Sequence, residues 1–160
     1  MALDDSTILI TGGCGQIGLA ITQYLQSHHP SAKIHVLDLS APKVPISGVT
    51  YHTGNVTDAT RISSLFAVIE PEVVFHTAGL IPSVAEKLGL NTEQNFTEVN
   101  VEGTRNVLDA AKKSKLKAFV FTSSADVVKG DSWQDLRGVN EEMPMPEKFD
   151  SVYGKSKVGL

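Results

Sequence analysis

The chain has 160 residues, of which 41% are hydrophobic and 20% are charged, as expected for one globular domain with an apolar core. Its net charge of −4 argues against a nucleic-acid partner, because proteins that bind nucleic acids usually carry a basic stripe. No apolar run approaches the ~20 residues that a spanning helix needs, so we expect no integral membrane segment.

The N-terminus and the cysteine content favour an intracellular protein. The first residues, MALDDSTILIT, include two acids and no basic region, so a secretory signal is not expected. The single cysteine, Cys14, excludes an internal disulfide and fits a reducing compartment. The five histidines are scattered without the spacing of metal ligands, and no metal site is predicted.

Strands and helices are predicted to alternate along the chain. Apolar, β-rich segments predict strands at 7–11, 33–38, 49–54, 72–79 (with the loop that follows) and 117–124. Helical spacing predicts helices at 15–27, from a cap at Thr57 or Asp58 to Pro71, at 91–113, and from about Ser151 onward. Proline, glycine and polar residues predict loops at 40–48 and 125–150.

This alternation predicts an α/β fold, with residues 1–160 in one domain. Right-handed crossovers give a doubly wound parallel sheet with strand order 3-2-1-4-5. Such sheets bind ligands at the carboxyl ends of their strands, near the switch point between strands 1 and 4. The polar residues at those ends are Thr11, His76, Thr122 and Ser124.

The segment TGGCGQIG, residues 11–18, is typical of a dinucleotide-binding loop. It contains the GxGxxG pattern, follows a predicted strand, opens a predicted helix, and precedes Asp38 by twenty residues. Glycines allow the backbone to approach a pyrophosphate, and the helix N-terminus offers free N–H groups. The alternative is a tight glycine turn without a ligand, which this context makes less favoured.

Asp38 at the end of the second strand indicates NAD rather than NADP. A carboxylate there can accept hydrogen bonds from ribose hydroxyls and would repel a 2′-phosphate. The alternative is an aspartate that caps its own turn. Asn55 and Val56 follow the third strand and are candidates for contact with the adenine, although an ordinary loop before a helix cap remains open.

Tyr153 and Lys157 are one turn apart on one predicted helix face. A tyrosine hydroxyl is a poor base near neutral pH, and a neighbouring ammonium favours its ionised form. Such a pair can take a proton from an alcohol while hydride leaves the carbon, and Ser124 can hold the substrate oxygen. Alone, YxxxK also fits a solvated helix; the upstream glycine loop favours the catalytic interpretation.

These motifs together resemble the N-terminal half of an extended short-chain dehydrogenase/reductase. The resemblance rests on the glycine loop, Asp38, GNVTD (54–58), VFHTAG (74–79), VNVEGTRNVLDAA (99–111), FVFTSSADVV (119–128) and Tyr153-x-x-x-Lys157. FTSSADVVKG with EEMPMPEKFDSVYGKSK is more narrowly similar to the 3β-hydroxysteroid dehydrogenase branch. Within that branch, the chain is most similar to decarboxylating sterol-4α-carboxylate 3-dehydrogenases.

The resemblance implies that residues 1–160 form one NAD(P)-binding, Rossmann-like domain, the N-terminal half of such an enzyme. It also implies a set of site residues. The implied catalytic residues are Ser124, Tyr153 and Lys157. The implied cofactor-binding residues are Gly12, Gly15, Gln16, Ile17, Gly18, Asp38, Asn55, Val56, His76, Thr77, Ala78, Thr122, Tyr153 and Lys157. Gln16 departs from the hydrophobic residue usual in the branch, and Asn55 replaces a usual Asp. For Asn100 we favour a structural role, tying its helix to neighbouring backbone.

The implied reaction is NAD-dependent oxidation of a sterol-like 3β-hydroxyl to a ketone, with loss of a 4-carboxylate in decarboxylating members. Family members are about twice as long, so the substrate lobe is expected to be missing here. A homodimer is a further expectation, as is an intracellular location, cytoplasmic or peripheral at the endoplasmic reticulum membrane. The alternatives are a truncated, non-catalytic dinucleotide-binding fragment and a sugar-nucleotide epimerase or dehydratase.

Overall fold

The computed structural model describes residues 3–130, 140 and 142–158, which divide into two compact units. Unit 1 comprises Met1–Gly79 and Glu102–Thr122, and unit 2 comprises Leu80–Val101 and Ser123–Leu160. Unit 1 contains the glycine loop and Asp38, whereas unit 2 contains the YxxxK motif. The predicted assignment of residues 1–160 to one dinucleotide-binding domain stays a prediction.

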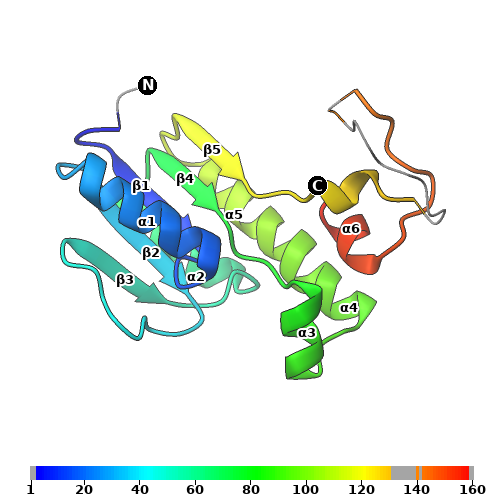
Figure 1. The fold of residues 1–160 in the computed structure, drawn as a ribbon. Helices are drawn as coiled ribbons and strands as arrows, with labels where there is room; N and C mark the ends of the chain where they lie inside the picture. The colour runs from blue at the N-terminus through cyan, green and yellow to red at the C-terminus, as the bar shows by residue number, and fades with distance from the viewer. Residues whose placement is uncertain (1–2, 131–139, 141, 159–160) are drawn as a thin grey trace. The chain divides into compact units, whose positions relative to one another are not determined.

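Unit 1 is built on a five-stranded parallel sheet (Figure 1). The strands, in spatial order, are β3 (Val49–Thr53), β2 (Lys33–Asp38), β1 (Thr7–Thr11), β4 (Val73–His76) and β5 (Ala118–Phe121). The predicted fold class and strand order are therefore confirmed. Ile8 pairs with Ile34 on one side and with Val73 on the other, which places β1, buried at four of its five positions, at the centre of the sheet.

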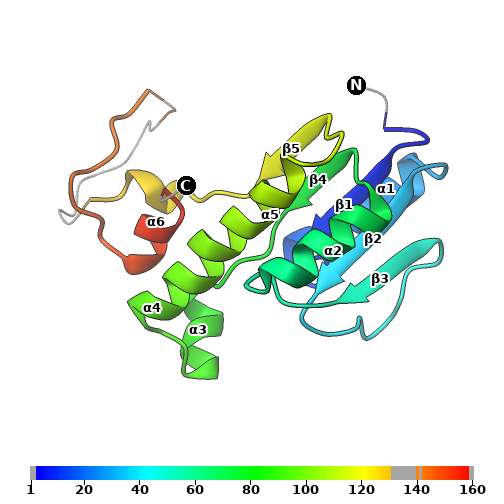
Figure 2. The same ribbon diagram turned by 180° about the vertical axis from the view of Figure 1, so that it is seen from behind.

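Helices cover both faces of this sheet (Figures 1 and 2). On one face, α1 (Gln16–His28) packs Leu25 against a cluster that includes Ile8 and Ile10. On the other, α2 (Ala59–Ile69) and α5 (Gly103–Ala111) pack against Leu9. The central strand β1 is apolar at consecutive positions because both of its faces are covered.

Local signals explain where α2 begins and ends. The carboxylate of Asp58 accepts a hydrogen bond from the Arg61 N–H at 2.9 Å, which confirms the predicted helix cap. At the other end Glu70 adopts a left-handed conformation with φ 44°, directly before Pro71. The helix stops there because proline disfavours helical geometry in the residue before it.

Unit 2 is made of short helical segments, several of which the sequence did not reveal. They are α3 (Pro82–Leu88), α4 (Glu93–Phe96), the π-helical turn η1 (Thr97–Glu102, whose last residue belongs to unit 1), the 3-10 turn η2 (Ala125–Val128) and α6 (Val152–Ser156). The single helix predicted at 91–113 is instead three segments, α4, η1 and α5. The predicted loop at 125–150 contains η2 and one bridge between Gly130 and Phe149, and part of it lies outside the described residues.

Candidate functional site

The glycine loop turns against the backbone that follows β4. Gly12 has φ +73°, and a Cβ there would lie 2.6 Å from the Ala78 nitrogen. Thr77 reinforces this approach, because its hydroxyl donates to the Thr11 carbonyl at 2.8 Å. Only glycine fits at position 12, since it alone tolerates both the left-handed conformation and the contact.

The loop leads into α1 with its first turn accessible. Gly15 is the N-cap residue and makes no side-chain cap, while Gln16 and Ile17 are exposed. Gly18 is buried, and a Cβ there would lie 2.8 Å from the Thr77 hydroxyl. The first N–H groups of a helix have no partner within it, so this end can receive an anion.

The carboxylate of Asp38 is fixed beside this loop. Its Oδ2 accepts from the Cys14 N–H at 2.9 Å, and its Oδ1 accepts from the Leu39 N–H at 2.8 Å. The alternative interpretation of Asp38, a cap of its own turn, is thus observed as well. A carboxylate offers about four acceptor positions, so these two bonds leave capacity for ribose hydroxyls.

Cys14 has no sign of redox activation. Burial, with a contribution from the Asp38 carboxylate, raises the pKa of its thiol. The thiol donates to the Ser40 carbonyl, with a sulfur–oxygen distance of 3.6 Å. A raised pKa keeps the thiolate scarce, so the interpretation of Cys14 as a small tolerated residue is supported.

Asn55 and Val56 have different surroundings. Asn55 is exposed, and its side-chain oxygen accepts from the Thr57 N–H at 3.1 Å. Val56 is only 7% exposed and its side chain belongs to the apolar cluster under α2. A contact of Val56 with an adenine would therefore involve its backbone.

His76 is fully buried at the end of β4. Its Nδ1 lies 2.6 Å from the Thr11 hydroxyl oxygen and its Nε2 lies 2.9 Å from that of Thr104. Its side chain is therefore packed in the core of unit 1 and hydrogen-bonded there, because β4 is covered on both faces. The end of β5 is joined to the end of β4, because the Thr122 N–H donates to the His76 carbonyl at 3.1 Å.

Unit 2 contains the three predicted catalytic residues, Ser124, Tyr153 and Lys157. The Ser124 hydroxyl accepts from the Asp126 N–H at 3.2 Å and so caps η2. A hydroxyl that accepts one hydrogen bond still has its own proton to donate. The ring of Tyr153 is partly buried and meets Phe96 edge-on, with centroids 6.2 Å apart.

Lys157 is only 7% exposed, which is unusual for a lysine. Its Nζ lies 5.9 Å from the centroid of the Tyr153 ring. Burial lowers the pKa of Lys157, because removal from water disfavours the charged ammonium. The i, i+4 spacing places the Lys157 side chain beside the Tyr153 ring, as the sequence predicts, whereas the burial of Lys157 is a finding of the structure.

Gly154 has a structural role that the sequence did not reveal. It is buried, and a Cβ there would lie 2.7 Å from the Asp126 carbonyl oxygen. The absence of a side chain therefore allows α6 to pack against η2, the turn that Ser124 caps. In the sequence, Gly154 is a variable position within YxxxK, and nothing local signals this contact.

Asn100 has the structural role that we favoured. Its Oδ1 accepts from the Leu80 N–H at 2.6 Å, and its Nδ2 donates to the Leu80 carbonyl at 3.0 Å. It is 1% exposed and lies in η1. The side chain ties the helical run to the segment before α3, and this prediction is confirmed.

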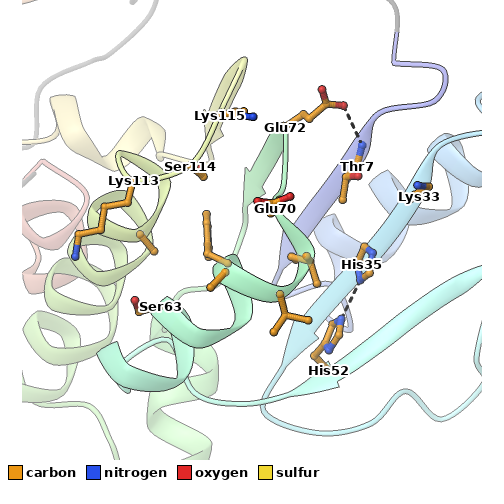
Figure 3. Close-up of a pocket in the computed structure, with 15 residues that line it drawn as sticks. Thr7, Lys33, His35, His52, Ser63, Glu70, Glu72, Lys113, Ser114 and Lys115 are labelled. Carbon is orange, nitrogen blue, oxygen red and sulfur yellow. Dashed lines mark hydrogen bonds between the residues drawn. The ribbon is translucent and has the colours of Figure 1, made fainter.

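Figure 3 shows a groove in unit 1, and no residue of the glycine loop lines it. It has a volume of ≈ 800 Å³ and includes Thr7 and Lys33, which begin their strands, whereas ligands of such sheets bind at strand carboxyl ends. Lys113 and Lys115 at its rim follow α5, where cations complement the negative end of the helix. None of the predicted site residues, all of them described, lines it.

Two negative findings apply to the described part of the chain. No group of three or more His, Cys, Asp or Glu side chains could hold a metal ion. No helix there is long and apolar enough to cross a bilayer.

The family follows from sequence comparison. The profile of the 3-beta hydroxysteroid dehydrogenase/isomerase family matches residues 9–159. The chain belongs to this family. The predicted family and enzyme class are therefore confirmed, whereas the predicted homodimer and location stay predictions.

Relatives in this family include two dehydrogenases. The 3 beta-hydroxysteroid dehydrogenase type 7 of Homo sapiens is 35% identical over 160 residues, covering 93% of this chain and 41% of that protein. The decarboxylating sterol-4-alpha-carboxylate 3-dehydrogenase of Saccharomyces cerevisiae is 30% identical over 159 residues, covering 94% of this chain and 43% of that protein. The chain thus spans less than half the length of these relatives.

Solved structures share the fold. A UDP-galactose 4-epimerase is 30% identical with a TM-score of 0.77, covering 96% of this chain and 48% of that one. A Bordetella bronchiseptica enzyme in complex with NAD⁺ is 26% identical with a TM-score of 0.77, covering 96% and 50%. Structural neighbours of this 3β-hydroxysteroid dehydrogenase family chain thus include a protein solved with NAD⁺.

Proposed function

We propose that the chain carries the cofactor-binding and proton-transfer residues of an NAD-dependent oxidoreductase. Its substrate would be a sterol, steroid or triterpenoid-like alcohol whose 3β-hydroxyl becomes a ketone. The observation that carries the proposal is the Asp38 carboxylate, held beside the glycine loop in a chain of the 3β-hydroxysteroid dehydrogenase family. The names of the two dehydrogenase relatives support the sterol class.

The residues of unit 1 fit NAD. The accessible first turn of α1 would receive the pyrophosphate, and Gly12 and Gly18 keep side chains out of the cradle. The Asp38 carboxylate would accept from ribose hydroxyls and repel a 2′-phosphate, which favours NAD over NADP. When bound, NAD would accept the hydride that leaves the carbinol carbon.

The residues of unit 2 would take up the proton that the substrate hydroxyl loses. Tyr153 takes the hydroxyl proton as hydride leaves the carbon, and Ser124 donates to the substrate oxygen. The ammonium of Lys157 stabilises negative charge on the tyrosine oxygen. Burial strengthens the interaction between the two charges, because water is excluded, but it also lowers the pKa of Lys157 and so makes the ammonium harder to form.

We extend the proposal to substrates with a carboxylate at carbon 4. Once carbon 3 is a ketone, that carboxylate is β to the carbonyl. The bond from carbon 4 to the carboxylate carbon then breaks, CO₂ leaves, and the electron pair passes into the enolate of the ketone. One relative is named as decarboxylating, which supports this step.

Calorimetric titration with NADH and with NADPH tests the cofactor assignment. We expect NADH to bind more tightly than NADPH. Asp38→Asn should weaken NADH binding by roughly 10- to 100-fold, because a charge-assisted hydrogen bond contributes about 1.5–3 kcal/mol. Asp109→Asn is the matched control, since that carboxylate is exposed on α5 and pairs with Lys112. Tighter binding of NADPH, or an unchanged Asp38→Asn variant, would contradict the assignment.

NADH formation with a 3β-hydroxysterol then tests the reaction, and CO₂ release from its 4-carboxylated form tests the extension. Tight NADH binding without NADH formation would instead identify a non-catalytic dinucleotide-binding chain.

A sugar-nucleotide epimerase is the second candidate, favoured by the 30% identical UDP-galactose 4-epimerase structure. An epimerase oxidises and then reduces the same sugar, so it interconverts substrates without net NADH formation. Incubation with UDP-galactose separates the two, because only the epimerase would yield UDP-glucose.

A further inference from the structure

The side chain of Ser156 lies buried between two parts of unit 2. It is 4% exposed, and its hydroxyl accepts from the Asn100 Nδ2 at 2.9 Å. The same hydroxyl donates to the Tyr153 carbonyl at 2.8 Å. Since Asn100 also holds the Leu80 backbone, a continuous hydrogen-bonded path runs from residue 80 to the backbone of Tyr153.

The local geometry of Asn100 supports a special role for this path. Asn100 lies in η1, a π-helical turn between two α-helical segments. Such turns are rare inside helices and are frequent at functional sites. The turn presents the Asn100 amide to both Leu80 and Ser156, so the unusual backbone coincides with the contact that reaches α6.

A simpler explanation accounts for only half of this arrangement. A serine hydroxyl in a helix commonly bonds a carbonyl three or four residues earlier, which explains the bond to Tyr153. It does not explain the bond from Asn100, which lies 56 positions away. Because α6 has only five residues, it cannot be stable alone and needs such tertiary contacts.

A second polar contact of α6 makes a useful comparison. The Lys155 ammonium donates to Glu93 at 2.7 Å, and both side chains are more than 60% exposed. Exposed ion pairs contribute little, because water and salt screen them. Buried hydrogen bonds contribute more, because their loss leaves a polar group unsatisfied. Ser156 and Lys155 thus both link α6 to the segment 93–102, but we expect the Ser156 hydrogen bond to stabilise this contact more than the Lys155 ion pair does.

We propose that Ser156 is a positioning residue, which holds the helix that carries Tyr153 and Lys157 in register with Asn100 and Leu80. The inference rests on the proposed function, because it assigns Ser156 to the site of that reaction. It goes beyond that function in adding a residue that contacts neither substrate nor cofactor.

The titration of Lys157, followed by NMR in the full chain with labelled lysines, tests the proposal without turnover. Lys157→Arg assigns the signal. We expect Ser156→Ala to raise the Lys157 midpoint toward that of a solvated lysine, because a loosened α6 exposes the ammonium. Lys155→Ala should leave it unchanged. A folded Ser156→Ala chain with the wild-type midpoint would overturn the proposal, since mere loss of stability does not alter the native titration.

Two further variants keep the test decisive. If Ser156→Ala does not unfold cooperatively, Ser156→Cys replaces it, since a thiol has similar volume but bonds weakly; we expect a smaller shift in the same direction. Ser156→Thr retains the hydroxyl and should restore the wild-type midpoint. A shift in Ser156→Thr as large as in Ser156→Ala would show that packing, not the hydroxyl, matters, and would refute the proposal.

A kinetic arm separates this inference from the proposed function. With a 3β-hydroxysterol, we expect Ser156→Ala to lower kcat by about 10- to 100-fold while KM for NAD⁺ stays constant, as misplacement of reacting groups predicts. An unchanged kcat in an active enzyme would refute positioning alone. A wild-type chain without activity would refute the proposed function, and the Lys157 titration would still decide the role of Ser156.

Discussion

Replacement of Gly154 by alanine sets two opposing effects against each other. In most helices this change is stabilising by about 1 kcal/mol, because alanine has the higher helix propensity. Here the added Cβ would lie 2.7 Å from the Asp126 carbonyl oxygen, whereas ordinary contact begins at 3.4 Å. The two backbones must therefore separate by about 0.7 Å, and no flexible side chain can rotate away to relieve the clash.

The clash should prevail over the propensity. Overpacking of this kind typically costs about 1–3 kcal/mol. We therefore expect Gly154→Ala to lower the free energy of unfolding by up to about 2 kcal/mol despite the better helix former. Because α6 also carries Tyr153, the shift should lower kcat by roughly 10-fold or more in an active enzyme.

Urea unfolding of Gly154→Ala beside Gly89→Ala measures this effect. Gly89 has φ +67° and nothing within 4 Å of a built Cβ, so its variant reports backbone strain without a clash. Only Gly154→Ala should also raise the Lys157 midpoint, because only that change moves α6. A Gly154→Ala chain as stable as wild type, or more so, would refute the close approach of α6 and η2.

The remaining predictions concern two histidines and the glycine loop of unit 1 and Asn100 of unit 2. His35 and His52 lie in the groove of Figure 3, with His35 Nδ1 3.0 Å from His52 Nε2. Burial lowers the pKa of both side chains. The unfolded chain therefore binds more protons, so stability should be full above about pH 6.5 and fall as the pH drops below it; the urea midpoint of the double His→Gln variant should vary less over that range. Gly12→Ala should abolish NADH binding, because the Cβ meets Ala78; retained affinity would contradict the cradle. Asn100→Ala should lower the free energy of unfolding by about 2 kcal/mol or more, since it leaves Leu80 unpaired, and a loss below about 0.5 kcal/mol would disprove its structural role.

The sheet of unit 1 could be predicted because its signals are local. Apolar strands such as 7–11 and the Asp58 cap act within a few residues, and right-handed crossovers fix the order of parallel strands. The buried His76 was harder to predict: its place at a strand end suggested a ligand contact. Strand β4 is covered on both faces and the His76 side chain is fully buried, whereas the predicted contact of this position with a cofactor stays a prediction.

Unit 2 was predicted less well because its structure depends on distant contacts. Helical periodicity cannot distinguish a π-turn from an α-helix, so η1 was absorbed into one long predicted helix. The helix α3 was missed although Pro82 and Gly89 mark its two ends. Its seven residues follow a strand loop and carry too few apolar positions to show a period.

The pattern Tyr-x-x-x-Lys names two side chains but not the contacts that hold them in place. The motif specifies the reacting side chains, and a regular helix brings them to one face. A helix of five residues does not hold that face in place by itself. Gly154 and Ser156, two of the three positions that the motif leaves open, make the close contacts to Asp126 and Asn100 that do so. On the proposed function, the reactivity of the pair would therefore depend on residues between Tyr153 and Lys157 whose partners are 28 and 56 positions away.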